Sequence, residues 1–179
     1  MDSISPGVPV VWTVGHSNRS LEEFLALLTE HRIEAVADVR RFPGSRRQPQ
    51  FGGQALALSL PQHGIAYRWI PQLGGRRRVQ PGSRNDGWRN ASFQGYADHL
   101  ATPEFADGLE ELLAMAGGLR TAMMCSEALW WRCHRSLISD VLRYLGAQVL
   151  HISDARHTTV HPYTSPARIV DGELSYAAD

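Results

Sequence analysis

Short apolar runs alternate with amphipathic segments along most of the 179-residue chain. Runs rich in β-branched and aliphatic residues are typical of buried strands, and five are predicted, over residues 8–14, 35–39, 65–70, 121–124 and 148–152. Apolar residues at helical spacing predict helices between them, beginning at Ser20, covering 53–60 and 93–100, running from Thr102 to Gly117, and covering 134–145.

Two of the helix starts carry capping signals. Ser20 is followed three residues later by Glu23, the pattern in which each side chain accepts from the other residue's main-chain amide. Thr102 supplies a capping hydroxyl, with Pro103 at the first helical position and Glu104 in the first turn. Both helices are therefore predicted to begin at a defined residue.

The alternation of strands and helices predicts the fold class. Successive parallel strands are joined by right-handed crossovers, and layered domains of this kind carry helices on both sides of the sheet. We therefore predict a single α/β domain over 1–179, with a mostly parallel sheet of about five strands and helices on both faces. The motifs fall in a core over about 10–162.

Polar clusters stand where each predicted strand ends. They are Gly15-His16-Ser17, Asp38-Val39-Arg40, Gly74-Gly75 with the arginines after it, Cys125-Ser126-Glu127, and His151-Ile152-Ser153-Asp154. In open parallel sheets, ligands bind outside the carboxyl ends of the strands. These clusters predict a functional site at that edge.

Composition limits the class of protein. With 43% hydrophobic and 20% charged residues, the chain resembles ordinary globular proteins. No apolar run approaches the roughly 20 residues that cross a bilayer, and residues 1–9 lack the basic and apolar regions of a signal peptide. Cys125 and Cys133 are too few for a disulfide framework. We expect a reduced, cytoplasmic protein that does not contact a membrane.

The zero net charge hides a strong asymmetry. All 18 basic residues are arginines, and residues 40–89 hold ten of them against a single acid, Asp86, a net charge of +9. Within this segment, residues 71–90 show no periodicity and predict a long loop. The planar guanidinium suits bidentate recognition of phosphate. The segment predicts a polyanionic or phosphorylated ligand, with a solvated basic face as the alternative.

The motifs resemble one known family. They are T-V-G-H-S at 13–17, D-V-R-R-F-P-G-S-R at 38–46, L-G-G at 73–75 and C-S-E-x5-C-H-R at 125–135. Together they resemble the domain of unknown function 488 family, over roughly residues 11–162. The resemblance implies an intracellular α/β protein of a family common in bacteria, and it implies a set of motif positions. It implies no reaction.

The cysteine-rich segment admits several interpretations. Cys125, Cys133 and His134 could hold zinc together with His157 or His161, although the spacing is not a standard zinc pattern. A nucleophilic cysteine is a second possibility, which bulky residues 128–131 disfavour for a loop that wraps an oxyanion. We favour a third, an anion site formed by Arg132 and Arg135 at a helix start. Both cysteines could also be small core residues.

Further candidates are distributed over the same edge. His16 is a candidate proton carrier or a turn-stabilising group. Asp38 and Glu127 either do acid–base work or orient Arg40 and Arg135, since unpaired acids there would be costly. The 157–161 segment is expected to be an extended loop. Aromatic residues beside arginines could stack nucleobases or pack over the core: Trp88, Trp130 and Trp131.

These features favour an intracellular enzyme acting on a phosphate-bearing substrate, a nucleotide or nucleic acid. Its candidate catalytic residues are His16, Asp38, Cys125, Glu127 and His134, and its candidate anion-binding residues are Arg40, Arg46, Arg132 and Arg135. Arg135 and Glu127 are predicted to belong to one site. No cofactor is predicted. The alternatives are a non-catalytic nucleic-acid-binding module that uses residues 40–89, and a zinc-dependent enzyme.

Overall fold

The strands of the computed structural model, which describes residues 9–178, form a mostly parallel six-stranded sheet. The order is β3-β2-β4-β1-β5-β6, with β1 (Val10–Gly15), β2 (Ala35–Asp38), β3 (Ala66–Trp69), β4 (Thr121–Cys125), β5 (Gln148–Asp154) and β6 (His157–Val160). Only the β5–β6 pair in this sheet is antiparallel. The predicted α/β class and mostly parallel sheet are confirmed, and β6 replaces the expected loop. Residues 1–8, including the expected start of the first strand at Val8, lie outside the described residues.

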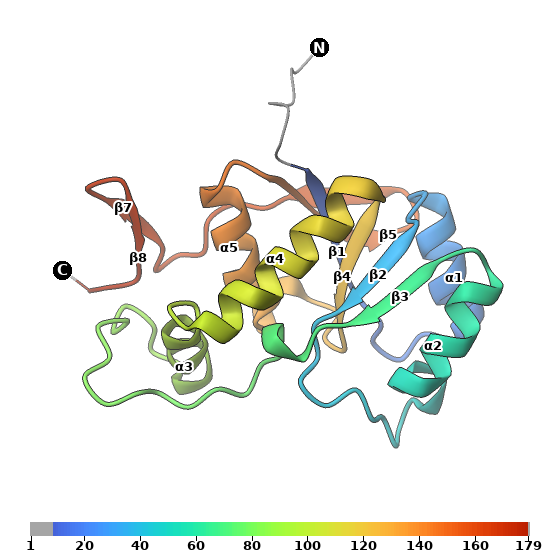
Figure 1. Ribbon diagram of the computed structural model, residues 1–179, viewed down its shortest axis with the longest axis horizontal. Helices are drawn as coiled ribbons and strands as arrows, with labels where there is room; N and C mark the ends of the chain where they lie inside the picture. The colour runs from blue at the N-terminus through green and yellow to red at the C-terminus, as the bar shows by residue number, and fades with distance from the viewer. Residues whose placement is uncertain (1–8, 179) are drawn as a thin grey trace, which may run out of the picture.

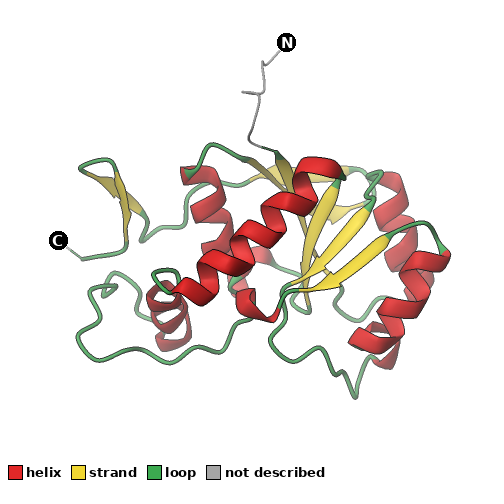
Figure 2. Ribbon diagram, viewed as in Figure 1, coloured by secondary structure: helices red, strands yellow, loops and turns green. Residues whose placement is uncertain are grey.

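Helices cover both faces of the sheet, as predicted (Figures 1 and 2). Helices α1 (Leu21–Glu30) and α2 (Gly53–Gln62) lie on one face, and α3 (Ala91–His99), α4 (Pro103–Gly118) and α5 (Arg135–Tyr144) on the other. Successive strand residues enter opposite cores, as the twofold strand period requires. Val11 packs in the core of α3, α4 and α5, whereas Trp12 packs in the core of α1 and α2.

The predicted helix starts are present. The capping box of Ser20 and Glu23 is complete, with both hydrogen bonds at 3.0 Å. Thr102 Oγ1 accepts from the amide of Phe105 at 3.2 Å. Helix α2 continues through Pro61 to Gln62, two residues past its predicted end. The chain then reverses at Gly64, which has a φ of 75°.

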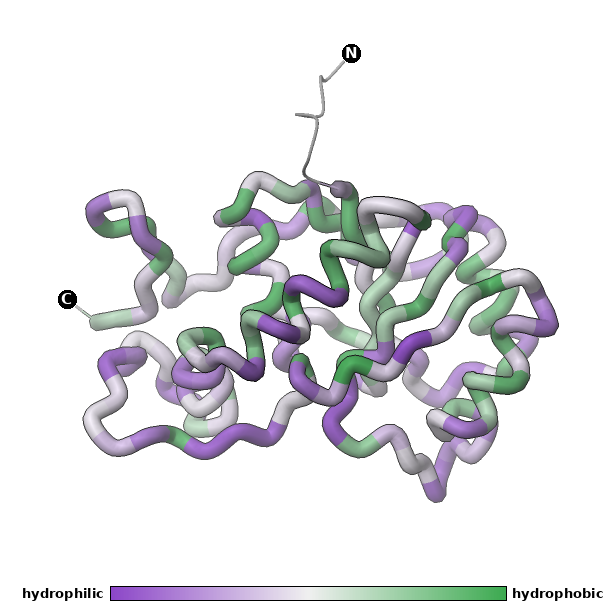
Figure 3. The backbone as a smooth tube through the Cα atoms, in the orientation of Figure 1, coloured by the Kyte–Doolittle hydropathy of each residue, from purple (hydrophilic) through white to green (hydrophobic). Residues whose placement is uncertain are grey.

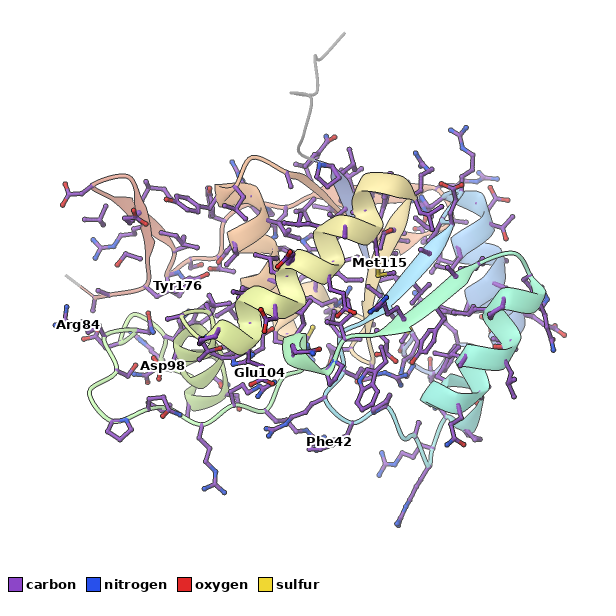
Figure 4. The ribbon with its side chains drawn as sticks, in the orientation of Figure 1. Phe42, Arg84, Asp98, Glu104, Met115 and Tyr176 are labelled. Atoms are coloured by element: carbon purple, nitrogen blue, oxygen red, sulfur yellow. The ribbon has the colours of Figure 1, made fainter. Side chains whose placement is uncertain are left out.

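Past η2 (Pro71–Leu73), the arginine-rich loop is predominantly hydrophilic, as the hydropathy colouring shows (Figure 3). The loop is nevertheless anchored, because the Asp98 carboxylate accepts from the Gln80 amide and from the Ser83 and Asn85 side chains at 2.6–2.8 Å. Figure 4 shows Asp98 on the side of α3 that faces this loop. The Gly87 amide also donates to the Tyr176 carbonyl at 2.8 Å, just past an unpredicted hairpin, β7 (Arg168–Val170) and β8 (Glu173–Ser175).

No helix within residues 9–178 has the length and apolar character needed to span a membrane.

Candidate functional site

A cavity of about 300 Å³ opens beyond the carboxyl ends of β1, β2 and β4. Its chemically active lining consists of two histidines, two cysteines and three arginines: His16, Arg40, Arg41, Arg76, Cys125, Cys133 and His134. None of the described residues that line it is an acid. Three predicted strand ends thus meet in one electropositive pocket, whose rim carries the 62% exposed Phe42 (Figure 4).

Asp38, at the end of β2, holds Arg40 in place. Its carboxylate accepts from the Arg40 Nε and Nη2 atoms at 2.8 and 2.7 Å, and also from the Tyr67 hydroxyl at 2.6 Å. Asp38 is fully buried and does not line the cavity. In this arrangement the carboxylate orients an arginine, which leaves it poorly placed for proton transfer to a ligand.

His16 follows β1 and is fixed as a neutral ring. Its Nδ1 lies 2.8 Å from the Ser17 carbonyl, which requires a proton on Nδ1. Its Nε2 is then an acceptor, 3.3 Å from Arg40 Nη1. Burial lowers the pKa of His16, and the Arg40 charge lowers it further. The ring also stacks on Phe51, with the centroids 4.4 Å apart.

The two cysteines form the centre of the pocket. Their Sγ atoms are 3.1 Å apart, although they belong to β4 and to the segment just before α5. Burial would raise the pKa of Cys133, but the hydrogen bond from Cys125 and the charge of Arg135 outweigh burial and hold that pKa well below its ordinary value. Burial and the Cys133 sulfur raise the pKa of Cys125 well above its ordinary value. Arg135 and its main-chain amide therefore favour the thiolate form of Cys133, whereas burial favours the thiol form of Cys125.

Arg135, at the first position of α5, is 1% exposed and directs its guanidinium behind the pocket. Its main-chain amide and its Nε lie 3.4 and 3.3 Å from Cys133 Sγ. Its other donors reach Thr13 Oγ1 at 3.0 Å and the Glu127 carbonyl at 2.6 Å. The expected common site of Arg135 and Glu127 thus involves the Glu127 main chain, while the Glu127 carboxylate accepts from the Leu129 amide at 3.4 Å.

His134 connects the start of α5 to the end of β2. Its Nε2 donates to the Val39 carbonyl at 2.6 Å, so Nδ1 carries the lone pair, and burial lowers the pKa of the ring. No hydrogen bond within residues 9–178 involves that Nδ1. The ring packs on Gly75, where a Cβ atom would stand 2.9 Å from Nδ1. Gly15 is confined more tightly, because its Cβ would stand 1.8 Å from the Glu127 carbonyl oxygen.

A buried chain of hydrogen bonds supports Arg135 from behind. Thr13 Oγ1 lies 2.6 Å from His151 Nδ1, and His151 Nε2 lies 2.8 Å from His161 Nδ1. His161 Nε2 then donates to the Asp140 carboxylate at 2.7 Å. Burial lowers the pKa of His151 to about 2, so this ring is neutral. The chain fixes Thr13, and Thr13 fixes one arm of Arg135.

Several predicted site residues lie elsewhere. Arg46 and Arg132 are exposed and, like Glu127, do not line the cavity. Trp88, Trp130 and Trp131 line a separate cavity of about 590 Å³ together with Arg89. Sequence reasoning missed Arg41 and Arg76 as pocket residues, although both stand in or beside the quoted motifs. It also missed Thr13, although Thr13 begins the quoted motif at 13–17, and Asp140, whose only signal was a polar residue inside an apolar stretch.

Within residues 9–178, no three His, Cys, Asp or Glu side chains are grouped as ligands of a metal ion would be. The sulfur atoms of Cys125 and Cys133 are close to each other, but the Nε2 of His134 is engaged by a carbonyl. Of the three residues of the zinc interpretation, His134 could therefore reach a metal ion only through Nδ1.

The chain matches a described protein family. A family model described as "Domain of unknown function DUF488" matches residues 20–142. No curated protein and no solved structure shows a significant match.

Proposed function

The chain belongs to the domain of unknown function DUF488 family, and we propose that it is a thiolate-dependent enzyme acting on a phosphate-bearing substrate, with Cys133 as the nucleophile. The family description names no reaction, so the proposal depends on the chemistry of the pocket alone.

One observation carries the proposal: a buried guanidinium whose ionisable partner is a thiol. An uncompensated buried cation would cost several kcal/mol, and no salt bridge between described residues involves Arg135. Its Nε faces Cys133 Sγ at 3.3 Å. A Cys133 thiolate balances this charge, and a thiolate, unlike a thiol, is a strong nucleophile.

The arginines around the thiolate support an anionic substrate. Arg40, Arg41 and Arg76 line the cavity without an acidic residue among the lining. Arg40 is already held rigidly by Asp38, so little side-chain entropy is lost when an anion binds. A guanidinium presents paired donors that match the oxygens of a phosphate. Phosphate is therefore the leading group, and carboxylate or sulfate would use the same donors.

A neighbouring cavity supports a nucleotide. This cavity, of about 740 Å³, is lined by Tyr67 and Trp69. It shares Gly44 and Ser45 with the 300 Å³ cavity that contains Cys133, which we call the thiolate pocket. Trp69 is 44% exposed. A phosphate beside Cys133 would place an attached sugar and base towards this cavity, and aromatic faces stack on bases of any sequence.

The roles follow from the positions of the groups. The Cys133 thiolate attacks phosphorus, the P–O bond to the leaving group breaks, and the leaving oxygen takes a proton from water, while Arg40 and Arg41 bind the phosphoryl oxygens as their charge grows. Hydrolysis of the S–P bond then releases inorganic phosphate and restores the thiolate. His134 Nδ1, which is unprotonated and free of internal hydrogen bonds, takes a proton from the water that hydrolyses the thiophosphate intermediate. Arg135 lowers the proton affinity of the nucleophile and does not contact the substrate.

The test is an assay of inorganic phosphate release from nucleoside mono- and diphosphates and from p-nitrophenyl phosphate. We expect turnover by the wild-type protein and only background release by Cys133→Ser. Arg41→Met should lower kcat/KM by about 10²-fold, as for other single donors to a developing anion. Arg156→Met is the matched control, because Arg156 is exposed and lies outside the pocket lining.

Acid quenching of the reaction should trap one phosphoryl group on Cys133, detected by peptide mass. The proposal is wrong if no phosphate ester is turned over by the wild-type protein, or if Cys133→Ser releases phosphate at the wild-type rate. Elemental analysis of the same preparation tests the zinc alternative, and stoichiometric zinc would favour it. We expect no stoichiometric metal.

A second candidate is a nucleic-acid-binding module. A cavity of about 720 Å³ adjoins the thiolate pocket at Arg41, Phe42 and Arg76 and is also lined by Arg77 and Arg78. A module would bind oligonucleotides with an affinity that falls steeply with salt, because bound phosphates release counterions. Its binding would not change in Cys133→Ser, which separates it from the enzyme.

A further inference from the structure

We propose that Cys133 and Cys125 are a reversible oxidation site for hydroperoxides, at which Cys133 is oxidised and Cys125 closes a disulfide with it. This site shares the Cys133 thiolate with the proposed function, but it does not depend on the phosphate substrate.

Proximity of the two sulfurs favours closure of a disulfide. The two Sγ atoms are 3.1 Å apart, and a disulfide bond is about 2.05 Å long, so the sulfur atoms need to approach by only about 1 Å. Cys133 lies in the short connection between η3 (Trp130–Arg132) and α5, which can move more readily than the end of a central strand. Such a pair is preorganised for closure.

The two sulfurs differ in their surroundings. Cys133 accepts hydrogen bonds from the Arg135 amide and Nε and lies at the amino-terminal end of α5, where the helix dipole favours an anion. Cys125 is 3% exposed, and burial keeps it protonated. One sulfur is thus a nucleophile and the other a thiol in contact with it, the arrangement typical of a peroxide-sensitive cysteine with its resolving partner.

The site is also accessible. Both cysteines line the 300 Å³ cavity, which is large enough to admit hydrogen peroxide and small alkyl hydroperoxides. The same arginines that face an anionic substrate also face the alkoxide or hydroxide that leaves during oxidation. The reaction therefore takes place at a site that solvent reaches, although Cys125 itself is buried.

The chemistry balances in two steps. The Cys133 thiolate attacks one peroxide oxygen, the O–O bond breaks, and the products are Cys133 sulfenic acid and an alkoxide, or hydroxide, that takes a proton from water. The Cys125 sulfur then attacks the sulfenic sulfur. The S–S bond forms, the S–O bond breaks, and the hydroxyl group leaves with the Cys125 proton as water. An external dithiol returns both cysteines to the reduced state.

The oxidised form lacks the thiolate that the proposed enzyme needs. Disulfide formation would therefore stop turnover reversibly, and it would also prevent the irreversible oxidation of Cys133 to sulfinic acid. A protein with this pair responds to peroxide by a reversible loss of activity.

The test is intact and peptide mass spectrometry after treatment of the reduced protein with a few equivalents of hydrogen peroxide. We expect a loss of two hydrogens per chain. Trypsin cleaves after Arg120, Arg132 and Arg135, so the two cysteines fall on different peptides, 121–132 and 133–135. A disulfide should link these peptides, and dithiothreitol should release them.

Variants separate the two roles. Cys125→Ser should gain oxygen on Cys133, first as a sulfenic acid that reacts with dimedone, and should form no link. Arg135→Met should react roughly tenfold more slowly at neutral pH, because less of Cys133 is thiolate. If a variant does not fold, the more reactive cysteine can be identified in the wild-type protein. One equivalent of iodoacetamide should then alkylate Cys133 and leave Cys125 unlabelled.

The inference is wrong if wild-type Cys133 proceeds to sulfinic acid without a linked peptide, or if neither cysteine reacts with peroxide. Addition of inorganic phosphate to the peroxide reaction tests the oxidation site and the proposed function separately. A linked peptide whose rate of formation is unchanged by phosphate supports the oxidation site while it counts against an anion in the pocket.

Discussion

The Arg135 side chain carries a charge that has to be balanced inside the protein, because it is 1% exposed. Carbonyl oxygens of Glu127 and Ala128 accept from its Nη2, but they are neutral. The groups beside it that can become an anion are the two cysteine sulfurs, of which Cys133 Sγ lies 3.3 Å from its Nε. The guanidinium therefore stabilises the thiolate, and the thiolate stabilises the buried guanidinium.

Replacement of Arg135 by Met should raise the pKa of Cys133, because the positive charge is removed while burial remains. The unperturbed thiol is only a few per cent ionised at pH 7, so alkylation of Cys133 by iodoacetamide at pH 7 should slow by about tenfold or more. The rate of labelling, followed by mass spectrometry over a pH series, measures the shift directly.

Arg132→Met is the matched control for this measurement. Arg132 precedes Cys133 in the chain, but its side chain is exposed, where water and salt screen its charge. Its replacement should change the labelling rate by less than about twofold. Equal effects of the two substitutions would contradict the assignment of Arg135 as the specific partner.

Among the elements of the fold, the long loop after β3 depends on a close contact with α3. A Cβ atom on Gly95, within that helix, would stand 2.0 Å from the Arg77 carbonyl oxygen. This contact holds the part of the loop that carries Arg76 and Arg77 against α3, next to the 300 Å³ cavity. The absence of a side chain at Gly95 therefore positions part of the candidate site.

Gly95→Ala should destabilise the protein by roughly 1–3 kcal/mol, the range for overpacking a tight contact, although alanine is the better helix former. Gly117→Ala is its control, because a Cβ atom there meets nothing within 4 Å. In α4 this substitution should stabilise by about 0.5–1 kcal/mol. Urea unfolding of both variants tests the pair, and stabilisation by Gly95→Ala would mean that the loop is not packed as described.

At the scale of the whole molecule, the supporting chain from Thr13 to Asp140 connects the sheet, α5 and the segment after β6. It contains two buried histidines, His151 and His161, whose rings are linked at 2.8 Å. The Asp140 carboxylate at its end also accepts from the hydroxyls of Thr164 and Tyr176. The carboxy-terminal segment is thereby tied to the buried side of the site.

This burial makes stability dependent on pH. Burial lowers the pKa of His151 to about 2, whereas an unfolded histidine has a pKa of about 6.5. Between these values the unfolded chain binds a proton that the folded chain does not, so stability falls as the pH falls below about 6.5. Burial also lowers the pKa values of His16, His99 and His134, with the same sign.

We expect the free energy of unfolding to decrease between pH 6.5 and 5 by about 2 kcal/mol from His151 alone. Urea unfolding at pH values across this window measures the slope, and His151→Gln should flatten it by that amount. The acids with lowered pKa values, such as Asp98 and Asp154, lose their contributions only at lower pH. A constant free energy of unfolding across the window would contradict a buried, neutral His151.

The sequence by itself determined the layered α/β fold and the sheet edge at which the candidate site lies. Hydrophobic periodicity is local, so the main helices, the five principal strands and the caps at Ser20 and Thr102 could be predicted from neighbouring residues. The parallel crossover rule then placed His16, Arg40 and Cys125 at one edge. The antiparallel strand β6 and the β7–β8 hairpin escaped this reasoning, because their residues are mostly exposed and carry weak periodic signals.

Only the tertiary structure decided the partners within that edge. The sequence paired Arg135 with the Glu127 carboxylate, but the guanidinium meets Cys133 and main-chain oxygens instead. It related Cys125 and Cys133 only as candidate zinc ligands, and it did not predict that their sulfurs lie 3.1 Å apart. Charge and spacing indicate which groups are available, whereas side-chain contacts depend on backbone positions fixed by packing between distant segments. That packing set the ionisation of Cys133, and so the chemistry that we propose.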